Sequence, residues 1–191
     1  MFYPTNAFVP ASLTTDEFLL RPLRATDVEL DYDAVISSRA ELWLRNDGEW
    51  PREGFTLEEN LADLVRHERE HIERVAFTYT VMNLHETECL GCIYINPLTL
   101  MLARSGGSDA QVASSDDYEA WITFWVRQSR LADDLDTRLL HALLAWFKTK
   151  WAFRRVAFAA RKEQTRQIQL FTAAGMDLLY ELPRSLVYTR S

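Results

Sequence analysis

The sequence has little of several residues that would place it in a specialised class of proteins. Only 2 of its 191 residues are cysteines, which excludes a disulfide-stabilised secreted scaffold. It has 6 glycines and 6 prolines, too few for a collagen-like or low-complexity chain. No apolar run is long enough for a membrane span, and residues 1–6 lack the basic and apolar regions of a signal peptide. We therefore expect a cytoplasmic protein with no membrane partner.

Basic residues are also in the minority. The chain has 21 Lys and Arg against 28 Asp and Glu, a net charge of -7, and its pI is near 5.1. This balance argues against nucleic acid as a partner. Hydrophobic residues make up 48% and charged residues 26%, as in ordinary globular proteins. A chain of this length predicts one domain, residues 1–191.

The two cysteines, Cys89 and Cys92, have the CxxC spacing of redox and metal sites. They fall in a predicted strand, where positions three apart point to opposite faces and Cα atoms lie about 10 Å apart. That separation is too long for a disulfide. We therefore expect two buried strand residues and no metal site.

One strand followed by one long helix organises the chain. Residues 118–127 are aromatic and β-branched and apolar on both faces, which predicts a central strand covered on both sides. Residues 135–151 carry apolar side chains at helical spacing, which predicts a helix packed on the sheet. A short loop joins them, and a loop that leads into a helix N-terminus is a common anion-binding site.

Further strands and helices are predicted on both sides of this unit. We expect strands at 18–23, 76–82, 89–95, 118–127, 155–159, 178–180 and 185–188, and helices at 27–43, 57–74, 135–151 and 162–174. Residues 1–16 are predicted as an extended lead-in and residues 102–117, with Gly and Ser, as a mobile loop. The order β-α-α-β-β-β-α-β-α-β-β predicts an α/β fold with a mixed sheet.

The helix at 57–74 contains a metal-like motif. Thr56 and Glu59 form a predicted capping box, and an apolar stripe follows: Leu57, Leu61, Leu64, Val65 and Ile72. His67-Glu-Arg-Glu-His71 matches the H-E-x-x-H of zinc hydrolases. It lies in a run of alternating charges beside the stripe, where a solvated helix face is expected. Since nothing fixes a third ligand, we expect no metal there.

The element order and several motifs resemble the GNAT acyltransferase superfamily. The similar segments are Leu19–Asp27, Cys89–Ile95, Ile122–Arg127, Leu135–Leu140 and Gln164–Met176. The resemblance covers nearly the whole chain. It implies transfer of an acetyl group from acetyl-CoA to an amine of a small molecule or a peptide, and it leaves a homodimer open.

The resemblance also implies a set of CoA-binding residues: Trp125, Val126, Arg127, Leu131, Ala132, Asp133, Asp134, Leu135, Asp136, Thr137, Gln164 and Phe171. The family binds the pyrophosphate with an Arg/Gln-x-x-Gly-x-Gly/Ala loop. Here Leu131 stands at the basic position, and Asp134 and Asp136 stand at the small ones. The tyrosine that serves the family as general acid corresponds to Phe171, which has no proton to donate.

The acidic loop therefore separates two hypotheses. Asp133, Asp134 and Asp136 can cap the following helix, but they would repel a diphosphate. The first hypothesis is an N-acyltransferase in which Glu119, at the start of the central strand, is the general base. Tyr94 either faces the same cleft or packs in the sheet. The alternative is a catalytically inactive GNAT-fold module that binds a partner or dimerises.

Overall fold

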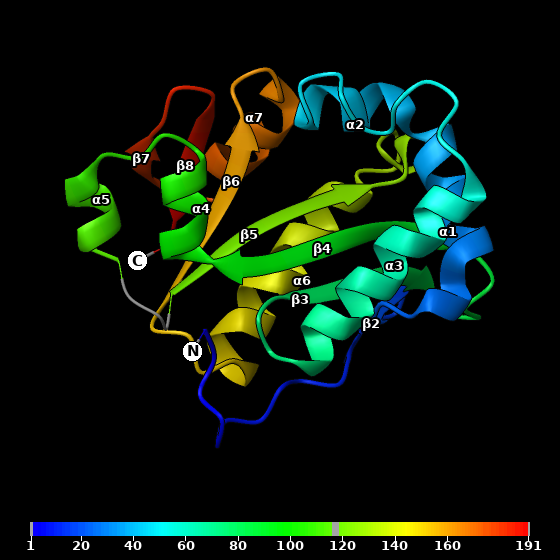
Figure 1. Cartoon of the computed structure of the whole chain (residues 1–191), viewed down its shortest axis with the longest axis horizontal. Coiled ribbons are helices and arrows are strands. Elements are labelled where there is room, and N and C mark those ends of the chain that lie inside the picture. Colours follow the sequence, from blue (N-terminus) through cyan, green and yellow to red (C-terminus); the bar gives the residue numbers. More distant parts are fainter. Residues whose placement is uncertain (1, 116–118, 191) are drawn as a thin grey trace.

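The computed structural model describes residues 2–115 and 119–190, which form a mixed sheet with helices on both faces (Figure 1). The sheet has the order β1-β2-β3-β4-β5-β6-β8-β7. Its strands are β1 (Leu13–Thr14), β2 (Phe18–Pro22), β3 (Phe77–Asn83), β4 (Cys89–Pro97), β5 (Glu119–Val126), β6 (Arg155–Arg161), β7 (Asp177–Glu181) and β8 (Ser185–Thr189). The helices are α1 (Val28–Ser37), α2 (Arg39–Arg45), α3 (Leu57–Ile72), α4 (Leu98–Arg104), α5 (Asp109–Ala113), α6 (Leu135–Lys150) and α7 (Thr165–Ala173), with 3₁₀ turns η1 (Ala25–Asp27) and η2 (Gln128–Arg130).

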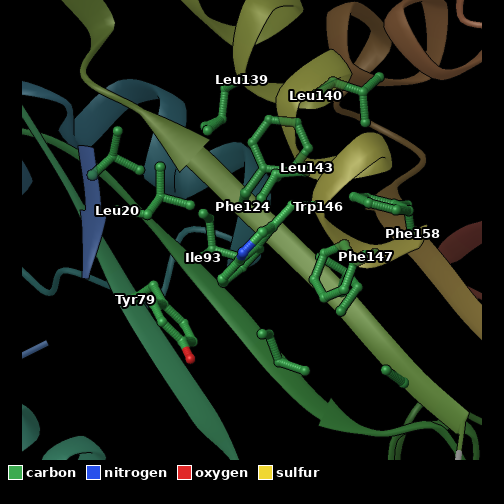
Figure 2. Close-up of a cluster of buried hydrophobic side chains, with 14 of the residues drawn as sticks. Leu20, Tyr79, Ile93, Phe124, Leu139, Leu140, Leu143, Trp146, Phe147 and Phe158 are labelled. Atoms are coloured by element: carbon green, nitrogen blue, oxygen red, sulfur yellow. The ribbon is translucent and has the colours of Figure 1, made fainter. Parts of the chain in front are cut away.

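Helix α6 packs on one face of the sheet, as its apolar spacing predicts. Side chains alternate along β5, so Ile122 and Phe124 point toward α6. Figure 2 shows Phe124 and residues of β2, β3 and β4 packed against Leu139, Leu143 and other side chains of α6. Leu139 and Leu143 are fully buried. The predictions of a central strand and of a helix packed on it are confirmed, although Tyr118 lies outside the described residues.

Helices α1, α3 and α4 cover the opposite face (Figure 1). There Trp125 of β5 packs in a cluster with residues of α1, α2 and α3, and Trp121 packs with Leu98 and Leu102 of α4. Within the described residues, no helix is both long enough and apolar enough to cross a membrane. The sheet thus separates the face that α6 covers from the face on which α1, α3 and α4 pack.

The sheet opens between its two parallel strands. β5 and β6 pair only from Glu119↔Arg155 to Ile122↔Phe158, and beyond this point they diverge (Figure 1). The backbone N–H and C=O groups on both edges of a strand need hydrogen-bond partners, which a neighbouring strand, solvent or a ligand can supply. Because the N–H and C=O of one strand residue point to the same edge, Phe124 and Val126 direct theirs into the opening. We call this opening the β5–β6 splay.

Strand β4 contains a bulge that the sequence pattern does not reveal. Gly91 lies opposite Val81 and Cys89 lies opposite Met82, so Leu90 is an extra residue on β4. The bulge shifts the alternation by one residue and places Cys89 and Cys92 on the same face, in one buried cluster. The expectation that they point to opposite faces, too far apart to share a site, is therefore wrong.

Three expectations about secondary structure are corrected. The predicted helix at 27–43 is η1, α1 and α2, because the chain turns at buried Ser38, whose Oγ accepts a hydrogen bond from the N–H of Gln128. Half of the predicted loop at 102–117 is helical, since α4 packs on β4 and β5, α5 packs on α4, and Ser108 caps α5; residues 116 and 117 lie outside the described residues. The lead-in contains the short strand β1. The observed order therefore has more elements than predicted.

Candidate functional site

A polar groove crosses the sheet face that α1, α2 and α3 cover. Its larger part is a cavity of about 370 Å³, here called cavity 1, lined among others by Asp31, Arg45, Trp50, Asn60, His67, Tyr94 and Thr123. A neighbouring cavity of about 150 Å³, cavity 2, shares Arg45 and Thr123 with it and reaches Ala160 and Gln164. The groove thus leads from α3 to the β5–β6 splay.

Helix α3 presents its polar side to the sheet, against expectation. Of the predicted stripe, Leu64 is buried at 2% exposure, but Leu57, Leu61, Val65 and Ile72 are 40–76% exposed. The predicted capping box is present, with Thr56 and Glu59 bonding each other's backbone N–H. The buried side carries Asn60 and the histidines, because they find hydrogen-bond partners on α1 and β3. The prediction that the H-E-x-x-H side is solvated is therefore wrong.

His67 and Tyr94 lie side by side in cavity 1. Their ring centroids are 5.4 Å apart. Nδ1 of His67 is 3.2 Å from a carboxylate oxygen of Glu70 and 3.2 Å from the hydroxyl of Thr78. An Nδ1–H tautomer fits these neighbours and leaves Nε2 as the basic nitrogen, which accepts a hydrogen bond of 3.3 Å from the Arg66 guanidinium. Burial lowers the pKa of His67, so its imidazole is neutral at pH 7.

Tyr94 has the chemistry of a proton donor. Its hydroxyl accepts a hydrogen bond of 3.4 Å from the indole N–H of Trp125, so its own O–H remains available. Burial raises the pKa of Tyr94 well above its ordinary value, which keeps the phenol protonated. Thr123 is its cross-strand partner on β5, at the first position past the last β5–β6 pair. Tyr94 therefore faces the cleft.

Arg45 connects the cavities to the splay. Its guanidinium donates to the carbonyl of Phe124 (2.9 Å) and to the hydroxyl of Thr123 (2.6 Å), and it lies 5.0 Å from the Tyr94 ring centre. Burial lowers the pKa of Arg45. Within residues 2–115 and 119–190 it makes no ion pair. Two of its five N–H donors thus fix it to β5, and the others remain for a ligand.

The acidic loop is organised by an arginine that sequence reasoning missed. Arg166 of α7 bonds the Asp136 carboxylate at 2.7 and 2.9 Å, Asp134 at 2.9 Å and the carbonyl of Leu131 at 2.9 Å. The carboxylate of Asp136 raises the pKa of Arg166 above its ordinary value. Asp134 is the N-cap residue of α6, but its φ is 53° and its side chain makes no capping bond. The expectation that Asp134 caps the helix with its carboxylate is wrong; it holds Arg166 instead.

The α6 N-terminus nevertheless keeps free donors. In the part of the chain that the structure describes, the N–H groups of Ala132, Leu135 and Asp136 donate no hydrogen bond. Such groups favour an anion. The nearby arginines are already paired, Arg127 with Asp33 and Glu88, and Arg130 also with Glu88. An incoming diphosphate would therefore meet donors, a paired cation in Arg166, and competing carboxylates.

The remaining predicted site residues lie apart from one another. Trp125 and Val126 are buried at the splay end of β5, Thr137 lies in the first turn of α6, its N–H 3.0 Å from an Asp136 carboxylate oxygen, and Gln164 lines cavity 2. Phe171 is fully buried among aromatic rings. Glu119 is 2% exposed, is paired with Arg155 at the paired end of β5, and lines neither cavity described above.

Comparisons with known proteins agree on the fold. No protein-family model matches the chain, and no curated protein matches it in sequence. A RimL ribosomal L7/L12 α-N-protein acetyltransferase in complex with coenzyme A superposes with a TM-score of 0.70 at 16% identity, over 94% of this chain and 97% of that one. The microcin C7 self-immunity acetyltransferase MccE, in complex with acetyl-CoA and AMP, gives 0.71 at 12% identity, over 96% and 98%. A ribosomal-protein-S5-alanine acetyltransferase from Vibrio fischeri gives 0.67 at 13%, over 94% and 95%. The chain has the GNAT acetyltransferase fold.

Proposed function

We propose that the protein is an acyl-CoA-dependent N-acyltransferase that transfers an acetyl group to the amine of a small molecule or a peptide. The observation that carries this proposal is the continuity of the polar groove with the β5–β6 splay through the shared lining residues Arg45 and Thr123. A donor in the splay and an amine in cavity 1 would meet beside Tyr94. The acetyl-CoA and coenzyme A complexes of two structural neighbours support acetyl-CoA as the donor.

The donor is proposed to bind along β5 and the α6 N-terminus. The free N–H groups at the start of α6 and the guanidinium of Arg166 would hold the diphosphate. The backbone N–H groups of Phe124 and Val126 point into the splay and would bond the amide and thioester oxygens of the donor. The spare N–H groups of Arg45 would stabilise negative charge that develops on the thioester oxygen.

In the proposed reaction the amine nitrogen attacks the thioester carbonyl carbon. His67, oriented by Glu70, takes the proton that the nitrogen loses, because its Nε2 is unprotonated at pH 7; the amine would replace the Arg66 guanidinium, which is 3.3 Å from Nε2. The tetrahedral intermediate expels the CoA thiolate, and Tyr94 protonates the sulfur. Tyr94 would thus supply the proton that Phe171 lacks. Glu119 remains the alternative base, although its pairing with Arg155 and its distance from the cavities make His67 the better placed group.

The proposal is tested by measuring release of CoA thiol from acetyl-CoA in the presence of a panel of primary amines and of peptides with a free N-terminal amine. We expect amine-dependent thiol release by the wild type and a loss of at least about tenfold in kcat for Tyr94→Phe, since general acids contribute about 10²–10⁴-fold. The matched control is Tyr180→Phe, whose hydroxyl lies outside the groove against Ser114. Equal rates for both variants and the wild type would contradict the role of Tyr94.

A non-catalytic module is the second candidate function. It is favoured by Arg45, which already occupies the carbonyl of Phe124 in the splay, and by the carboxylates that surround Arg166. This candidate predicts that no amine in the panel stimulates thiol release, even where calorimetry detects CoA binding.

A further inference from the structure

Three buried side chains converge on one point beneath cavity 1. Asp31 of α1 and Cys89 and Cys92, on either side of the β4 bulge, are 4%, 1% and 0% exposed. Their candidate ligand atoms all lie within 4.8 Å of one another, and no other group of three His, Cys, Asp or Glu side chains in the described residues does so. The Asp31 oxygen and the Cys92 sulfur are 3.5 Å apart.

These separations suit a metal ion. A tetrahedral zinc ion, with Zn–S near about 2.3 Å and Zn–O near about 2.0–2.2 Å, holds sulfur and oxygen ligands about 3.5 Å apart and two sulfurs about 3.8 Å apart. Gly91 fixes the arrangement, because its φ is 150° and a Cβ there would lie 2.1 Å from the Trp125 carbonyl oxygen. No other residue fits between β4 and β5, so the bulge holds both thiols on one face.

Neighbouring side chains orient these groups by hydrogen bonds, as the neighbours of metal ligands do. The amide of Asn60 donates to the other oxygen of Asp31 at 2.9 Å, which directs the first oxygen toward Cys92. The hydroxyl of Thr80 lies 3.5 Å from the sulfur of Cys89 and can donate to a thiolate. No Lys, Arg or His forms an ion pair with Asp31 in residues 2–115 and 119–190. A buried carboxylate without a cation is costly unless it is neutral or binds a metal.

We propose that Asp31, Cys89 and Cys92 bind one thiophilic divalent cation of the zinc class. On binding, each thiol transfers its proton to solvent and each sulfur forms one bond to the metal, with no change of oxidation state. Asp31 also lines cavity 1, from which water completes the coordination. The ion would tie α1 to β4 and so brace the floor of cavity 1, whether or not the protein is an acyltransferase.

Titration of reduced, chelator-treated protein with Cd²⁺ tests the site through the ultraviolet charge-transfer absorbance of cadmium thiolates. Because the chain has only these two cysteines, any such signal must come from them. We expect saturation at one equivalent, and affinity at least about tenfold weaker in Asp31→Asn and about 100-fold weaker in Cys92→Ser. Asp63→Asn, a second acid of cavity 1, is the matched control and should bind like the wild type.

A second measurement uses the unaltered protein, so that a variant that fails to fold cannot hide the answer. Zn²⁺ at about 100 times its Kd should raise the midpoint of thermal unfolding of the wild type, because it binds the folded form. Absence of thiolate absorbance, absence of a shift in the midpoint, or equal Cd²⁺ affinity of Asp31→Asn and the wild type would each overturn the proposed three-ligand site.

Discussion

Asp134 offers a sharp test of how the acidic loop affects CoA binding. It lies at the α6 N-terminus with φ 53°, and its side chain is 70% exposed. Asp136 is a poor choice for the same test, since it is 2% exposed and holds Arg166 through two hydrogen bonds. Replacing Asp134 alone removes one negative charge while Asp136 keeps Arg166 in place.

The exposure of the Asp134 side chain sets the expected change in the free energy of CoA binding. Two unit charges 4 Å apart interact by about 1 kcal/mol in water and about 4 kcal/mol at a dielectric of about 20. Because Asp134 is mostly exposed, the lower figure applies, and about 1 kcal/mol corresponds to about a fivefold change in Kd. Glycine also relieves the left-handed backbone, by about 1–2 kcal/mol, which offsets the loss of an exposed ion pair of about 0–1 kcal/mol. The variant should therefore remain folded.

Calorimetric titration with CoA at low and high salt is the assay. We expect Asp134→Gly and Asp134→Asn to bind CoA about three- to tenfold more tightly than the wild type at low salt, with the gain shrinking at about 1 M salt, where the Debye length is about 3 Å. Asn retains the bulk of Asp, so agreement between the two variants assigns the effect to charge. Unchanged or weaker binding by both would refute the reasoning.

Three other predictions address the base, the bulge and the buried acid. His67→Gln should lower kcat by about 10²–10⁴-fold and abolish the rise of kcat/KM as pH increases through a pKa below 6.5. His141→Gln, on the exposed side of α6, is the control and should change neither. A pH profile that is retained in His67→Gln would exclude His67 as the base. Gly91→Ala should destabilise the protein by more than about 3 kcal/mol in denaturant unfolding. The control Gly48→Ala, whose added Cβ meets nothing within 4 Å, should cost about 1–2 kcal/mol. Equal effects of the two variants would contradict the close approach of β4 and β5. Burial raises the pKa of Asp31 to about 6 from about 4 in the unfolded chain, so its contribution to stability is present below about pH 4 and lost as pH rises through 6. In metal-free protein, the free energy of unfolding of Asp31→Asn should therefore rise by up to about 3 kcal/mol relative to that of the wild type between pH 4 and 7. A difference in unfolding free energy that does not change with pH would contradict the shift.

The elements with strong local patterns could be predicted from the sequence. The apolar stripe of α6 and the two-faced pattern of β5 placed both in the core, and Gly175, which follows the C-cap residue of α7, has φ 70°, the left-handed conformation in which helices commonly end. The side of α3 that faces the sheet could not be predicted from its apolar residues. Its orientation depends on hydrogen bonds from Asn60 and His67 to α1 and β3, and such long-range partners leave no periodic signal.

The candidate site was predicted less completely than the fold. A motif resemblance located the loop before α6, and its role as the donor segment stays a prediction. His67 and Tyr94 were considered but could not be brought together, since their proximity depends on the packing of α3 on the sheet. Arg45 and Arg166 gave no signal at all, because each acts on a segment distant in sequence. The cysteine pair was misjudged because a bulge changes the alternation of a strand without changing its composition.

Hydrogen exchange with and without acetyl-CoA tests the central claim, that an acyl-CoA occupies the β5–β6 splay and the α6 N-terminus. Acetyl-CoA should slow exchange at the amides of Phe124 and Val126 and in the first turn of α6, at Leu135 and Asp136, while the amides of β7 stay unchanged as an internal control. Slowed exchange elsewhere with no change in these segments, or no change at millimolar acetyl-CoA, would contradict it.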